Sequence, residues 1–154
     1  MLFRSTIAST PTVLDTGSVA LNPGDTRTLV ATRSGGSVAA RATVDATRPI
    51  SGRAQLQIVN AAPSVGSGLN SYLVKAGATI GTTTAAAVDQ PVLAFATAVA
   101  AGGTYDVVFS LATDPTAPIA GPDALLVVDG GIYTIYAADA AGGGAPYRIV
   151  VDDN

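Results

Sequence analysis

Few residues of this chain have side chains that could carry out catalysis. The 154 residues include no histidine and no cysteine, which removes the usual general base, the common hydrolase triads and the usual ligands of structural zinc. All 11 acidic residues are aspartates, and a pair of carboxylates is the machinery of glycoside hydrolysis. Most of them are predicted to stand singly in turns, which Asp favours: Asp15, Asp25, Asp114, Asp123, Asp129 and Asp139. The chain is therefore predicted not to be an enzyme and to need no cofactor.

Three other clusters have simpler interpretations. Asp152-Asp153-Asn154 offers oxygen ligands but lacks the spacing of a calcium loop, so it is interpreted as a solvated tail, and no metal site is predicted. Ser71 and Lys75 are four residues apart, one more than in the Ser-x-x-Lys motif. Gly142–Pro146 is not followed by Lys-Ser/Thr, so it is predicted to be a hairpin loop rather than a phosphate-binding loop.

Tyrosines are the remaining candidates for a binding surface. They alternate with aliphatic residues in predicted strands, and most of them are expected in the core. Tyr72, Tyr136 and Tyr147 could instead line an exposed sheet face that binds a glycan or a peptide. This reading requires these side chains to be accessible and clustered, and it is lost if all three are buried.

The composition favours strands over helices. Apolar residues make up 48% of the chain, Glu is absent and Lys75 is the single lysine, while Val and Thr are frequent. A net charge of −3 gives no nucleic-acid footprint. No stretch approaches the ~18 apolar residues of a membrane span, and Met1–Ile7 is too short and polar for a signal peptide. An all-β protein is predicted, with no nucleic-acid partner and no membrane span.

The charges are divided unevenly along the chain. Residues 1–53 carry six arginines against three aspartates, whereas residues 54–154 carry two basic residues against eight aspartates. Opposite signs favour docking of the two segments, within one chain or between chains, although salt screens the effect at a surface.

Strands and turns follow one another at short intervals. Predicted strands are Leu2–Ile7, Ser18–Leu21, Thr26–Thr32, Val38–Asp45, 52–63, Leu69–Lys75, Pro91–Val99, Thr104–Leu111, Ala124–Val128, Ile132–Ala138 and Pro146–Asp152. In residues 52–63, Leu56 and Ile58 share one face, opposite Gln55 and Gln57. Ala76–Gln90 is predicted to be a loop or one helical turn with a Thr cap, and Thr113–Asp123 a loop.

The two ends of the chain resemble each other at a spacing of 106 residues. Phe3 aligns with Phe109 and Thr28 with Thr134, and with one added Gly in the later loop Asp45 aligns with Asp152. Residues 1–47 are thus predicted to be the C-terminal half of a repeat, residues 48–51 a linker, and residues 52–154 a complete domain. About seven short strands in the complete copy are typical of an immunoglobulin-like antiparallel β-sandwich.

The predicted complete domain also resembles a known family. Residues 52–63, which end in Asn60-Ala61-Ala62-Pro63, and Gly68–Leu73 are similar to the apolar strand, Asn-Ala-(Ser/Ala)-Pro turn and second strand that open the "domain of unknown function 4397" family. Ala101–Val107 resembles its Ala-Gly-Thr-Tyr hairpin with one added Gly, and Asp129–Ile135 its Gly-x-x-Tyr-Thr strand. The resemblance spans residues 52–153, and residues 2–45 match only the tail of a preceding copy.

This resemblance implies bacterial proteins that are secreted or anchored to the cell envelope, often with tandem copies and a lipoprotein signal. A signal is not found in this chain, so the expected extracellular or envelope location comes from the resemblance. The expected function is a non-catalytic surface module with a structural or adhesive role. Because residues 1–47 would lack partner strands, they are expected to pack on the complete domain or to associate with a second chain by strand addition or domain swapping. The alternative is the glycan- or peptide-binding module; its ligand is not predicted.

Overall fold

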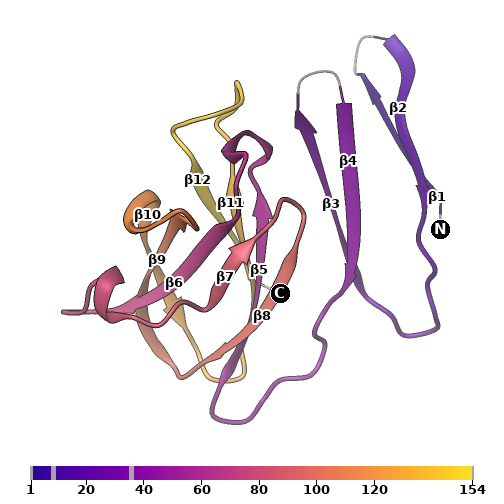
Figure 1. Ribbon diagram of the computed structural model, residues 1–154. Coiled ribbons are helices and arrows are strands. Elements are labelled where there is room, and N and C mark those ends of the chain that lie inside the picture. The colour runs from indigo at the N-terminus through magenta and orange to yellow at the C-terminus, as the bar shows by residue number, and fades with distance from the viewer. Residues whose placement is uncertain (1, 8–9, 35–36, 154) are drawn as a thin grey trace.

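The computed structural model describes residues 2–7, 10–34 and 37–153, with side chains from residue 18 onward (Figure 1). These residues form strands with two short 3₁₀ helices, η1 (Pro63–Val65) and η2 (Ile80–Thr82). The strands are β1 (Leu2–Ile7), β2 (Thr10–Ser18), β3 (Arg27–Ser34), β4 (Ser37–Val44), β5 (Ala54–Ala61), β6 (Leu69–Lys75), β7 (Ala87–Gln90), β8 (Phe95–Ala100), β9 (Gly103–Leu111), β10 (Asp114–Val127), β11 (Ile132–Ala138) and β12 (Arg148–Asp153). The all-β prediction is confirmed.

Eight of these strands form two packed sheets, as in a β-sandwich. One four-stranded sheet has the order β12-β11-β5-β8 and the other β10-β9-β6-β7. Neighbouring strands are antiparallel except β5 and β11, which run parallel. The sheets enclose one apolar core whose largest fully buried side chains are Phe109, Leu56, Ile58, Leu69 and Ile135.

Alternation along β5 and β9 explains which residues fill this core. Leu56 and Ile58 are buried between the sheets, while Gln55 and Gln57 lie on the outer face of β5, as predicted. Tyr105, Val107 and Phe109 of β9 are buried in the same core, and Leu111 packs against it. A period of two places alternate side chains on opposite faces of a sheet, so the sequence pattern is sufficient to orient these strands.

Two predicted loops are partly strand. Residues predicted as the Thr113–Asp123 loop belong to β10, which pairs with β9 through several register shifts. Pro fits there because β10 is an edge strand, where a missing N–H costs no ladder hydrogen bond. Within Ala76–Gln90, the helical turn is η2, capped by Thr79, but the last four residues form β7, which the sequence analysis missed.

The predicted strand Ser18–Leu21 is wrong in position. The strand is β2, Thr10–Ser18, which pairs with β1, and residues 19–22 have no regular structure. Pro11, Asp15 and Gly17 suggested a loop, but β2 belongs to a two-stranded hairpin, where breaker residues are tolerated.

The hairpin of β3 and β4 forms a third layer. It packs on the outer face of the β12-β11-β5-β8 sheet, where Val30 is buried against Val59 and Leu93. The β1–β2 hairpin lies beyond it, on the side away from the sandwich, and β2 contacts β4 (Figure 1). Residues 1–53 thus dock on the sandwich within one chain, one of the arrangements expected from sequence.

The two hairpins that the sequence alignment pairs differ in register. Thr134 of β11 faces Asp152 of β12, whereas Thr28 faces Thr43, two residues before Asp45. A two-residue shift keeps every side chain on its original face. The Asp45 carboxylate still accepts a hydrogen bond from the Thr28 N–H at 3.0 Å. The internal repeat remains a prediction.

Candidate functional site

The structure places the three candidate tyrosines in three different layers. Tyr72 is buried on the outer face of the β10-β9-β6-β7 sheet, in a cluster with Val74 and Val108. Tyr136 lies half-buried on the outer face of the opposite sheet, in the cluster around Val59 that the β3–β4 hairpin covers. Tyr147 is half-buried against the core between the sheets. No single face of the sandwich can present all three to one ligand.

Three tyrosine hydroxyls instead hold main-chain segments in place. The Tyr72 hydroxyl donates to the Pro115 carbonyl at 3.2 Å, and the Tyr105 hydroxyl donates to the Ala101 carbonyl at 3.0 Å. The Tyr133 hydroxyl accepts from the Val128 N–H at 3.0 Å. Each ring is buried, so these tyrosines combine a core contact with a fixed turn or strand entry.

The aspartates serve as separate turn and loop acceptors. Asp129 accepts from the Gly102 N–H at 2.8 Å, and Asp139 accepts from the Ser64 hydroxyl at 2.7 Å. Asp15 lies in β2, and Asp114 and Asp123 lie in β10, so these three are strand residues rather than the predicted turn residues. Residues 2–7, 10–34 and 37–153 bring no group of three or more carboxylates together.

Asp25 is the most strongly held of the turn aspartates. Its carboxylate accepts from the Asn22 main-chain N–H at 3.1 Å and from the Arg27 guanidinium at 3.0 Å. These donors, the main-chain one first, hold the pKa of Asp25 below its ordinary value of 3.8. The Arg27–Asp25 ion pair lies within the N-terminal segment, so it fixes the turn before β3 without contributing to docking.

Ser71 and Lys75 do not form a catalytic pair. Ser71 is buried within the sandwich, and its Oγ has no hydrogen-bond partner among the described residues. The Lys75 ammonium lies 5.8 Å from the centroid of the Tyr105 ring. Four residues of strand separate the two Cα atoms by about 13 Å, which is too far for one side chain to activate the other.

The remaining sequence candidates are also structural. Asp152 and Asp153 are exposed residues of β12, so the prediction of a solvated tail is wrong for them. The loop around Gly142–Pro146 joins β11 to β12, which confirms the predicted hairpin loop. Gly143 and Gly144 form main-chain hydrogen bonds to Ala140 within it.

The docking contact of the third layer joins residues far apart in the sequence. The Arg41 guanidinium lies 5.8 Å from the centroid of the Phe95 ring and donates to the Leu93 carbonyl at 3.4 Å. Gln57 donates to the Thr43 hydroxyl at 3.4 Å. The expected attraction between a basic and an acidic segment is therefore expressed at this contact by a ring and a carbonyl, with no carboxylate beside Arg41 in these interactions.

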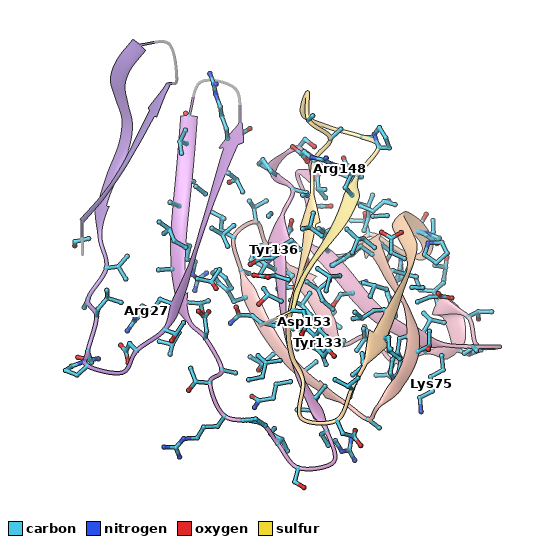
Figure 2. All side chains as sticks on the ribbon, turned by 180° about the vertical axis from the view of Figure 1, so that it is seen from behind. Arg27, Lys75, Tyr133, Tyr136, Arg148 and Asp153 are labelled. Carbon is cyan, nitrogen blue, oxygen red and sulfur yellow. The ribbon has the colours of Figure 1, made fainter. Side chains whose placement is uncertain are left out.

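Tyr136 is influenced by this covered face. Burial raises the pKa of Tyr136 above its ordinary value of 10.0, and the negative charges of Asp152 and Asp45 add to the shift. Tyr136 and Asp153 lie on neighbouring strands of this sheet (Figure 2). The docked hairpin thus forms part of the environment of a residue on the sandwich.

A buried amide pair is the feature that sequence reasoning missed. The Asn60 side chain donates to the Gln90 carbonyl at 2.8 Å and accepts from the Ala62 N–H at 3.1 Å. The Gln90 side chain donates to the Ile58 carbonyl at 2.8 Å and to the Ala94 carbonyl at 3.1 Å. Asn60 had been read only as a turn residue, and its spacing from Gln90 carries no sequence signal.

Two surface hollows border these elements. A cleft of about 560 Å³ lies between the end of β3 and the β11–β12 loop, and it is lined by Ala31–Arg33, Ala61, Pro63 and residues 138–143. A groove of about 310 Å³ runs beside β8 and is lined by small residues, Tyr105 and two cations, Arg53 and Lys75. No acidic side chain lines this groove.

Comparison with known proteins identifies no relative of this chain. No family model matches it, and no curated protein matches it either. Among the described residues, no helix has the length and apolar character needed to cross a bilayer. The functional argument therefore rests on the chain itself.

Proposed function

We propose that this protein is a non-catalytic β-sandwich module of the cell surface or envelope, with a structural or adhesive role, whose copies associate through β1–β4. One observation carries the proposal. Two two-stranded hairpins stand outside a complete sandwich, and the inner hairpin docks on an outer sheet face through a small contact centred on Val30 and Arg41.

These hairpins need a partner surface. An isolated two-stranded hairpin is marginally stable in water, and its free edges can accept further strands. The contact that β3–β4 makes with its own sandwich can equally form with the sandwich of a second copy, which is domain swapping. The connection from Asp45 to Arg53 contains no strand, only the isolated bridge between Ile50 and Arg53, so it can serve as the hinge of such an exchange.

The finer classification belongs to the same proposal. The hairpins β1–β2 and β3–β4 follow each other in the same order as β9–β10 and β11–β12. That order supports an immunoglobulin-like repeat whose C-terminal half is residues 1–47. The extracellular or envelope location, like membership of the domain of unknown function 4397 family, rests on the resemblance of residues 52–153.

Light scattering over a concentration series tests the association. The average mass of the native chain is expected to rise with concentration, and Val30→Asp is expected to reduce that rise because it places an unpaired charge against Val59 and Leu93. Ala31→Asp, at an exposed position on the other face of β3, is the matched control. Identical mass curves for the native chain and Val30→Asp would contradict the proposal.

A further inference from the structure

The four outer strands of the sandwich differ in how they are protected from further pairing. β10 carries Pro115, Pro118 and Pro122 and register shifts, and β7 is four residues long with the charged Asp89. Proline, bulges, charge and shortness are the devices that block edge-to-edge pairing. Both edges of the β10-β9-β6-β7 sheet are therefore protected.

The edges of the other sheet lack these devices. β8 is Phe95–Ala100 and contains neither proline nor charge. The centre of β12 is Ile149-Val150-Val151, and Val150 and Val151 are 47% and 39% exposed. Each strand has six residues, and neither pairs with a second neighbour in the described part of the chain. One sheet thus has two open edges of equal length.

The two open edges are complementary in charge. β12 ends in Asp152 and Asp153, whereas the groove beside β8 is lined by Arg53 and Lys75 and by no acid. The groove side of β8 presents the small side chains Ala98 and Ala100, with Ala86 opposite, which leaves room for an added strand.

The sheet register places these charges at matching heights. Asp153 pairs with Tyr133, Tyr133 with Leu56 and Leu56 with Ala98, so Asp153 and Ala98 lie in one row across the sheet. Because paired residues share a face and Tyr133 is in the core, the Asp153 side chain leaves β12 on the inner side. Lys75 and Asp153 lie well apart in one chain (Figure 2), so they can meet only between chains.

We propose that a second copy of this chain adds its β12 to the β8 edge, with its Asp153 entering the groove between Arg53 and Lys75. β8 and β12 run in the same direction, since both are antiparallel to the parallel pair β5 and β11. A copy in the same orientation therefore continues the sheet through a parallel pair of strands. The contact is head-to-tail and leaves one free edge at each end, so it builds a row of copies.

Charge exchange between the two edges tests this interface. Sedimentation equilibrium of the full chain should give an association constant that falls at least tenfold in Asp153→Lys and in Lys75→Asp, because each places like charges together. The doubly exchanged chain, Asp153→Lys with Lys75→Asp, should return to within threefold of the native value. Asp123→Lys on β10 changes the net charge as Asp153→Lys does and should leave the constant unchanged.

Single reversals that match Asp123→Lys, or a doubly exchanged chain as weak as the single reversals, would overturn the interface. The proposed exchange of β3–β4 uses the outer face of the sheet rather than its edges. Its association responds to Val30→Asp and not to these charges, so the two proposals fail separately. Equimolar Asp153→Lys and Lys75→Asp chains should form added heterodimers on mixing, because the changed residues face each other with opposite charge, and no added mass would also contradict the interface.

Discussion

The Arg41 guanidinium on β4 lies 5.8 Å from the centroid of the Phe95 ring on β8, joining two residues 54 positions apart. The same guanidinium donates to the Leu93 carbonyl. This pair fixes the angle at which the third layer meets the sandwich. It also makes the N-terminal hairpin dependent on a ring and a carbonyl that the sandwich supplies.

Replacement of Arg41 by Ala should loosen that layer. A cation–π contact and one hydrogen bond together contribute about 1 to 2 kcal/mol, so amide hydrogen exchange in β3 and β4 should speed up about five- to thirtyfold. Exchange in β5 and β9 should stay the same. Arg48→Ala, in the connecting segment, is the control, and equal exchange in both variants would show that Arg41 does not hold the hairpin.

Loss of the Asn60 side chain should destabilise the sandwich itself. Asn60→Ala leaves the Ala62 N–H and the Gln90 carbonyl buried without their side-chain partner, at a cost of about 2 to 3 kcal/mol in the free energy of unfolding. Urea denaturation measures this loss. Asn22→Ala, at an exposed turn position, should cost less than about 0.5 kcal/mol. Similar losses at both positions would refute the role of the amide pair.

Strand orientation was predictable because it depends on neighbours in sequence. The alternation of Leu56 and Ile58 with glutamines, and of Tyr105, Val107 and Phe109 with polar residues, is a local signal of period two. β10 escaped prediction because its prolines are tolerated only at a sheet edge, and edge position is a property of the assembled sheet.

The sites depend on contacts that no local pattern encodes. Asn60 meets Gln90 across 30 residues, and Val30 meets Val59 across 29. The tyrosine surface was proposed from alternation alone, which separates two faces of a strand but does not say what covers the outer one. Tyr72 is on that outer face, and packing around Ile80 and Ala85 covers it.

Gly131 should tolerate no side chain. A Cβ atom at this position would lie 2.6 Å from the ring of Tyr133 and 2.8 Å from its hydroxyl, so Gly131→Ala must displace the ring that holds the Val128 N–H. The expected loss is about 1 to 3 kcal/mol in the free energy of unfolding. Gly142→Ala is the matched control, since nothing lies within 4 Å of its Cβ position. Thermal unfolding with equal midpoints for the two variants would contradict this account.

Tyr136 should make stability fall in alkaline solution. Its raised pKa means that folding favours the neutral phenol, so its contribution is complete below the ordinary value of 10.0 and is lost as the pH rises through the folded pKa. Between about pH 9 and about pH 12, the free energy of unfolding of the native chain should fall more steeply than that of Tyr136→Phe. Parallel pH profiles in urea denaturation would exclude this shift.

The exchange of β3–β4 between copies is the central claim, and covalent trapping tests it most directly. The chain has no cysteine, and the side chains of Thr43 and Gln57 meet at the docking contact at 3.4 Å. A chain carrying both Thr43→Cys and Gln57→Cys should oxidise to an internal disulfide, which establishes that the geometry permits the bond. Mixing chains that carry only one of the two cysteines should then give a covalent heterodimer in excess of either homodimer. If the doubly substituted chain closes internally while the mixed chains stay unlinked at every concentration, the hairpin docks only on its own sandwich and the claim is wrong.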